Sequence, residues 1–213
     1  MTIDTPRPTL TRERVLTAAV EYADTNGLDK LSMRKLAASL GFEVMSLYNH
    51  VKNKPDLIRA MTDLVAAEML PLASLDDPKA ALRAHFVALR RVLEAHPWAA
   101  MCWATTIPGP ARWDIMEWQL EAVGSIAGLS EEQAHHSYHA LNNHVVGYVL
   151  QNAVLPFSED ELDDIAATIR TELDPDRHAR ILHHIVQHQE GEHGESFEHV
   201  LDLILVGMDD IAS

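Results

Sequence analysis

The feature that most restricts the fold of this chain is a succession of helix start signals, each followed by apolar residues at helical spacing. Thr11, Ser32 and Asn53 can each cap a helix N-terminus, and Asp77 precedes a proline that suits a first helical turn. No segment alternates apolar and polar residues for long enough to predict a β-strand. We therefore expect an all-α fold.

The signals also predict where the helices begin and end. They delimit helices over about 11–26, 32–40, 43–51, 53–70, 77–95, 97–103, 110–127 and 130–153, with an acidic helix to about 173, a histidine-rich helix after Pro175 and a final helix from Ser196. Ser130 and Gln133 have the spacing of a capping box. A glycine at position 41, where a tight turn needs positive φ, joins two short helices.

Two helices joined by such a turn have the spacing of a helix-turn-helix, with the helix over 11–26 as a buttress. An α-helix fits the major groove of B-DNA, and its N-terminal side chains reach the edges of the bases. The segment therefore predicts contact with double-stranded DNA. Helix pairs of this kind also occur in protein cores, so plain packing remains the alternative at this point.

The charge of the chain is divided unevenly, in a way that supports contact with DNA. The formal net charge is −15, but residues 1–55 hold eight lysines and arginines against six acidic residues. This segment has a net charge of +2, which leaves −17 for the remainder. We expect the N-terminal quarter to face the phosphates while the acidic remainder stays away from them.

The stretch LTAAVEYADTNGLDKLSMRKLAASLGFEVMSLYNHVKNKPDLIRAM resembles the DNA-binding domain of the TetR family of bacterial transcriptional repressors, most specifically in LYNHVKNKPDLI. A weaker resemblance, through HALNNHVVGYVLQ and FEHVLDLILVGMDDI, extends to the C-terminal domain of the tetracycline-repressor type. The resemblance implies a flexible arm over 1–10, a helix-turn-helix domain over 11–70 whose last helix is the connector, and an effector-binding and dimerisation domain over 71–213. It further implies a homodimer on a palindromic operator, released by a small-molecule effector.

The resemblance also implies roles for single residues. The residues expected to contact bases are Arg34, Val44, Met45 and Ser46, and those expected to contact phosphates are Ser32, Tyr48, His50 and Lys54. Val44 and Met45 stand where the tetracycline repressor has glutamine and proline. Apolar side chains there can touch a thymine methyl group but cannot form bidentate contacts with adenine, so the operator should differ.

A sensor of small molecules needs a cavity with apolar walls and a few polar anchors. All four tryptophans fall within residues 98–118, and the helix over 130–153 carries polar groups. The effector-binding residues that we predict are Trp98, Met101, Cys102, Trp103, Trp113, Met116, His139, Asn142, Asn143 and Gln151. Core packing is the alternative for each of them taken singly. The histidine that binds the magnesium–drug chelate in the tetracycline repressor falls near Cys102, so the resemblance does not support tetracycline as the ligand.

Other classes of function find less support in the sequence. The pairs His135/His139 and His184/His188 have the i, i+4 spacing that zinc uses, which leaves a metal-responsive regulator as an alternative, but the chain lacks a cysteine pair and a His-Glu-x-x-His motif. We expect no cofactor and no metal. No phosphate-binding loop or nucleophile motif appears, so an enzyme is the least favoured interpretation, after a ligand-binding module.

The broad apolar surfaces of two long helices predict self-association. Val200, Leu203 and Val206 lie off the main apolar stripe of the final helix, and the helix over 130–153 is similarly apolar on two sides. We expect a homodimeric four-helix interface, with a large intrachain core as the alternative. The single cysteine and the absence of a long apolar run or a signal peptide predict a cytoplasmic protein without a membrane partner.

Overall fold

The computed structural model describes residues 9–154, 159–190 and 193–212, so most of the arm predicted over 1–10 lies outside the described residues. The described residues contain helices and no strand, which confirms the all-α class. The α-helices are α1 (Arg12–Asn26), α2 (Met33–Leu40), α3 (Val44–Leu47), α4 (Lys54–Ala66), α5 (Pro78–Ala95), α6 (Pro97–Thr105), α7 (Pro110–Gly124), α8 (Glu131–Val154), α9 (Glu159–Glu172), α10 (Ala179–Glu190) and α11 (His193–Ala212). Two 3₁₀-helices follow α1 and α4, namely η1 (Leu28–Lys30) and η2 (Ala67–Met69).

The predicted capping residues begin the helices as expected. The side chains of Thr11, Ser32, Asn53 and Asp77 each accept a hydrogen bond from a backbone N–H in the first turn of α1, α2, α4 and α5. The capping box before α8 is reciprocal, because the backbone N–H of Ser130 donates to Gln133 Oε1 at 2.8 Å and that of Gln133 donates to Ser130 Oγ at 3.2 Å.

Several helix boundaries differ from the prediction, including the ends of α4 at Ala66 and of α6 at Thr105. The α-helical part of α3 ends at Leu47 rather than Val51, and hydrogen-bonded turns replace the remainder, with the N–H groups of His50 and Val51 both donating to the Leu47 carbonyl. The helix α7 ends at Gly124, before the left-handed Gly128 at φ 88°. The helix α11 begins at His193, three residues earlier than expected.

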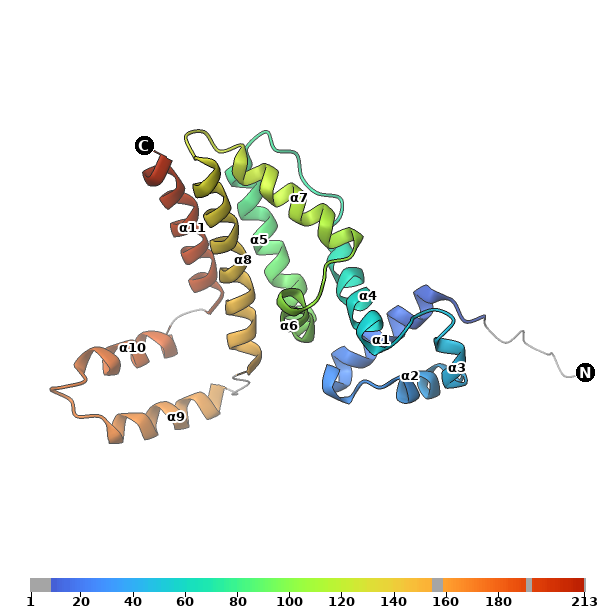
Figure 1. The fold of residues 1–213 in the computed structure, drawn as a ribbon. Helices are drawn as coiled ribbons and strands as arrows, with labels where there is room; N and C mark the ends of the chain where they lie inside the picture. Colours follow the sequence, from blue (N-terminus) through green and yellow to red (C-terminus); the bar gives the residue numbers. More distant parts are fainter. Residues whose placement is uncertain (1–8, 155–158, 191–192, 213) are drawn as a thin grey trace, which may run out of the picture.

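The helix α8 is the centre of the larger helical body (Figure 1), where it packs against α5, α6, α7 and α11. Its broad apolar surface is therefore mostly explained by neighbours within the chain. The helix α11 packs against α8 and α5. The pair α9 and α10 pack on each other and extend away from the bundle (Figure 1).

The helix α4 lies between the N-terminal helices and the larger body (Figure 1). It packs against α1 on one side and against α6 and α7 on the other. Its buried residues Leu57, Met61 and Val65 belong to one apolar cluster that runs from α1 through α8 to α11. A displacement of α4 would therefore change the packing of both the helix-turn-helix and the helices around α8. None of the described helices is long and apolar enough to span a bilayer.

Candidate functional site

The turn between α2 and α3 has the geometry that the sequence predicted. Gly41 adopts the left-handed conformation at φ 73° and ψ 29°, and its N–H donates to the carbonyls of Ala37 and Ala38 at the end of α2. Leu36 and Leu47 are fully buried in one apolar cluster with residues of α1, and α2 packs against both α1 and α3. The arrangement is a three-helix helix-turn-helix unit.

The residues predicted to contact DNA surround this turn with different degrees of exposure. Met45 is 73% exposed and Tyr48 is 42% exposed, although large apolar and aromatic side chains are usually buried. Arg34 is exposed on α2, whereas Val44, Ser46 and His50 are half-buried. Met45 and Arg34 can therefore reach a groove without rearrangement of the unit.

Two of the predicted phosphate contacts also serve the fold of the unit. The hydroxyl oxygen of Ser32 accepts a hydrogen bond of 3.2 Å from the Lys35 N–H as the cap of α2. The Lys54 Nζ donates to the Leu31 carbonyl at 2.6 Å and so joins the start of α4 to the segment before α2. Sequence reasoning missed this second role, because the two residues are far apart in the chain and nothing local connects them.

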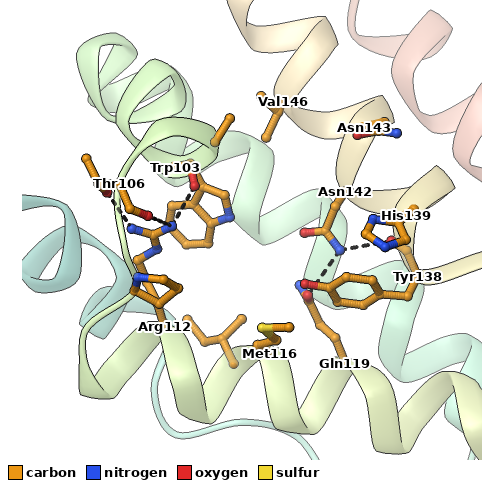
Figure 2. Close-up of a pocket in the computed structure, with 13 residues that line it drawn as sticks. Trp103, Thr106, Arg112, Met116, Gln119, Tyr138, His139, Asn142, Asn143 and Val146 are labelled. Carbon is orange, nitrogen blue, oxygen red and sulfur yellow. Dashed lines mark hydrogen bonds between the residues drawn. The ribbon is translucent and has the colours of Figure 1, made fainter. Parts of the chain in front are cut away.

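A cavity of about 400 Å³ lies between α6, α7 and α8 (Figure 2). Five of the predicted effector-binding residues line it: Trp103, Met116, His139, Asn142 and Asn143. Eight further residues line it that the sequence analysis did not select: Ala104, Thr106, Pro108, Arg112, Ile115, Gln119, Tyr138 and Val146. The cavity is reached from the surface where Ala104, His139 and Asn143 are exposed.

The other five predicted residues do not line this cavity. The indole N–H of Trp98 donates to Asp24 Oδ1 of α1 at 2.7 Å, and Cys102 is buried, which raises the pKa of its thiol. Met101 and Trp113 are exposed at the surface, as is Gln151. Consecutive residues of a helix point about 100° apart, so the aromatic residues of α6 cannot all face the same cavity.

The spacing along α7 and α8 holds a signal that could have found the missed residues. Arg112, Ile115, Met116 and Gln119 follow the i, i+3, i+4, i+7 pattern of one helix face. On α8 the same pattern runs from His139 through Asn142 and Asn143 to Val146. The faces of α7 and α8 that carry these polar and apolar residues therefore form two walls of the cavity. The sequence analysis instead selected mostly tryptophan-rich segments, including α6.

Arg112 is a buried cation in the wall of the cavity. Its guanidinium donates hydrogen bonds to Thr106 Oγ1 at 2.8 Å, to the Trp103 carbonyl at 2.5 Å and to the Thr106 carbonyl at 3.4 Å. The Arg112 Cζ also lies 5.1 Å from the centroid of the Trp103 ring, in a cation–π arrangement. Burial lowers the pKa of Arg112, an effect that the negative charge of Asp63 partly offsets.

A chain of hydrogen-bonded side chains, the half-buried Asn142 and the buried Gln119, connects the opposite wall of the cavity to α5. Asn142 Nδ2 donates to Gln119 Oε1 at 3.2 Å, and Gln119 Nε2 lies 2.9 Å from His85 Nε2. Burial lowers the pKa of His85 to about 4, so the imidazole is neutral near pH 7 and its Nε2 accepts the hydrogen bond from Gln119. The imidazole also packs against the Trp118 ring, with the centroids 4.8 Å apart.

The helix α4 holds the loop that borders the cavity. Arg59 donates to the carbonyls of Ile107 and Pro108 at 3.2 and 2.8 Å. The carboxylate of Asp63 accepts hydrogen bonds from the backbone N–H groups of Ala111 and Arg112 at 3.3 and 3.0 Å. Contacts of this kind connect the wall of the cavity to the helix that directly follows the helix-turn-helix.

The histidines do not gather into a metal centre within the described part of the chain. The rings of His135 and His139 lie edge to face with centroids 4.6 Å apart. No group of three or more histidine, cysteine or acidic side chains among the described residues is placed to hold a metal ion. The second predicted pair cannot be judged, because the side chain of His188 lies outside the described residues.

Similar structures have been solved for proteins of Streptomyces coelicolor. The transcriptional regulator SCO7222, a TetR, superimposes with a TM-score of 0.81 at 32% identity, over 96% of this chain and 100% of that chain. The TetR family protein ActR in complex with actinorhodin gives a TM-score of 0.84 at 26% identity, over 97% of this chain and 100% of that chain.

Sequence comparison gives the same relationship. An HTH-type transcriptional regulator from Saccharopolyspora erythraea is 36% identical over 150 residues, which are 70% of this chain and 63% of that protein, less than two thirds of its length. Residues 15–61 match the family described as bacterial regulatory proteins, tetR family, and residues 70–211 match the tetracyclin repressor-like C-terminal domain. The chain therefore belongs to the TetR family of bacterial regulatory proteins.

Proposed function

We propose that this protein is a transcriptional repressor that binds a palindromic operator as a homodimer and is released from it by a small-molecule effector. The observation that carries the proposal is the direct connection between a helix-turn-helix and a cavity of about 400 Å³ through Arg59 and Asp63 of α4. A regulator needs both sites and a shared element that differs between two states. Membership of a family of regulatory proteins favours this function over an enzyme.

The DNA-binding unit is proposed to place α3 in the major groove. The exposed Met45 would contact a thymine methyl group, and Arg34 would reach a base edge or a phosphate from α2. Ser32, Tyr48, His50 and Lys54 would lie beside the phosphates. The charge of +2 on residues 1–55, against −17 on the rest, favours this end of the chain for binding to DNA. Operator binding implies action in the cytoplasm, where bacterial DNA lies.

The outer face of α11 is proposed as the main dimer contact. Val200, Leu203, Val206 and Ile211 are exposed on it, and Leu203 and Val206 are the most exposed of the four, at 58% and 60%. A row of exposed branched apolar side chains on one helix is typical of an interface between subunits. A two-fold dimer would present two α3 helices to successive major grooves, about 34–36 Å apart or somewhat more.

The effector is proposed to act through α4. Binding in the cavity would favour one position of the 106–110 loop, and the hydrogen bonds from Arg59 and to Asp63 would carry that preference to α4. The ligand can shift the equilibrium only by its difference in affinity for the two states. The ligand-bound structure of ActR, with actinorhodin, supports a small molecule as the effector class.

The test is selection of operator DNA from a random duplex library, followed by mobility shifts at low and high salt. We expect an approximately palindromic site and binding that falls steeply as salt rises. Arg34→Ala should weaken operator binding by about 1–3 kcal/mol. Arg91→Ala removes the same charge from an exposed site on α5 and should leave binding unchanged. Failure to enrich any sequence, or equal losses in the two variants, would contradict the proposal.

A further inference from the structure

The cavity wall contains the positive charge of Arg112, which forms no ion pair with an acidic side chain in the described part of the chain. Arg112 is only 6% exposed, and all three of its side-chain hydrogen bonds end on neutral oxygen atoms of Trp103 and Thr106. A guanidinium has five N–H donors, so donors remain for another partner. No ion pair joins this side chain to a carboxylate among the described residues.

Asp63 is the acidic residue whose charge acts on Arg112, but its oxygens are occupied elsewhere. They accept hydrogen bonds from the backbone N–H groups of Ala111 and Arg112 at the start of α7. None of the residues that line the cavity is acidic. Burial of a cation without a carboxylate partner is unfavourable, and an incoming anion would remove much of that penalty.

The rest of the cavity fits the body of an aromatic molecule. Trp103, Ile115, Met116 and Val146 give it apolar surfaces between two polar ends. Figure 2 shows Arg112, Trp103 and Thr106 on one side and Tyr138, Asn142 and Gln119 on the other. The hydroxyl of Tyr138 has no hydrogen-bond partner among the described residues, and burial raises its pKa, so it remains protonated and can donate.

We propose that the effector is an aromatic carboxylate whose anionic group binds the guanidinium of Arg112, with the ring system against Trp103 and Met116. The proposal rests on the repressor function proposed above and specifies the class of its ligand. Charge-assisted hydrogen bonds between a guanidinium and a carboxylate are strong in a site shielded from water. An uncharged compound of the same shape would occupy the apolar surfaces but leave the charge of Arg112 without a partner.

The test compares matched acids and amides on the full-length protein by calorimetry at neutral pH. The probes are benzoate and benzamide, 2-naphthoate and 2-naphthamide, and anthracene-2-carboxylate and its amide. Each acid differs from its amide in charge and little in shape. We expect the best-fitting acid to bind about tenfold or more tightly than its amide. An amide that binds as well as its acid would overturn the proposal, and so would absence of binding by every acid at millimolar concentration.

Two variants separate the charge in the cavity from the stability of the loop. Arg112→Gln should abolish the preference for acids, and Arg112→Lys should keep it in weakened form. Arg59→Gln removes a guanidinium that binds the same loop at the Ile107 and Pro108 carbonyls but does not line the cavity, so it should keep the full preference. Persistence of the preference in a folded Arg112→Gln variant would overturn the proposal.

Mobility shifts on the selected operator distinguish failure of this inference from failure of the repressor function. If neutral compounds release the operator and acids do not, the repressor function stands and the ligand class proposed here is wrong. If acids bind through Arg112 but no operator is found, the ligand class stands and the repressor function is wrong.

Discussion

Asp63 of α4 supplies the cap that α7 lacks, because its carboxylate accepts a hydrogen bond of 3.0 Å from the backbone N–H of Arg112. The residue at the N-cap position is Gly109, which has no side chain to cap the helix. A side chain of α4 therefore accepts hydrogen bonds from backbone N–H groups in the first turn of α7, the helix that carries Arg112. Together with Arg59, which donates to the Pro108 carbonyl at 2.8 Å, this contact joins α4 directly to residues that line the cavity.

We expect Asp63→Ala to lower the free energy of unfolding by about 1 kcal/mol, the usual loss when a helix cap is removed. Operator binding and effector binding should each persist, but release of the operator by the effector should be weakened, because the loop and α4 would move more independently. Urea unfolding and mobility shifts with effector measure the two effects. Asp114→Ala removes an exposed carboxylate from α7 and should change neither. Normal release by Asp63→Ala would argue against this route.

Gly109→Ala should destabilise the protein by about 1–3 kcal/mol through overpacking. A Cβ at this position would lie 2.4 Å from Asp63 Cγ and 2.6 Å from its Oδ2, so the capping carboxylate would have to move. Gly124→Ala is the matched control, since its Cβ would meet nothing within 4 Å. Thermal unfolding of the two variants should show a clear loss for the first and no loss for the second, and equal stabilities would contradict the packing at Asp63.

The stability of the protein should decrease as the pH falls from about 6.5 to about 4 because of His85. The pKa of this residue is lowered to about 4 in the fold, from 6.5, so the unfolded chain takes up a proton in this window and the native state does not. Protonation of His85 in the unfolded chain should lower the free energy of unfolding by about 3 kcal/mol across this window. Above about pH 6.5 the residue should cause no further change with pH.

Urea unfolding at fixed protein concentration, repeated at several pH values, measures this dependence. His85→Asn should have a shallower decline than the unaltered protein, whereas His136→Asn, at an exposed site on α8, should follow the unaltered curve. A decline in His85→Asn as steep as that of the unaltered protein would show that other groups cause it.

Leu203→Glu should convert the proposed dimer to monomer. The side chain is 58% exposed on α11, so the charge would be tolerated by a folded monomer but would be buried without a partner in the interface. Sedimentation should show half the mass of the unaltered protein, with an unchanged helical circular dichroism spectrum. Ile107→Glu, at a loop position that is 72% exposed, should leave the mass unchanged. A monomeric mass for the unaltered protein would refute the dimer.

The sequence by itself determined where most helices begin and how the helix-turn-helix is built. Thr11, Ser32 and Asn53 bond to N–H groups three residues away, and Gly41 needs only its own backbone freedom, so each signal acts within one turn of chain. Such local interactions can be predicted from the sequence before the packing of the helices is known. The extent of α3 could not be predicted in this way, because Leu47 is buried in a cluster whose other members come mostly from helices distant in the chain.

Only the tertiary structure decided which side chains share the cavity. Trp98 and Trp103 are five residues apart on one helix, yet one bonds to Asp24 of α1 and the other lies under the guanidinium of Arg112. The direction in which each face of α6 points is set by its packing against α4, α5 and α8, of which α4 and α8 lie too far away in the chain for a local pattern to predict the contact. The dual role of Lys54, the cap from Asp63 and the unpaired charge of Arg112 all arise at such long-range contacts.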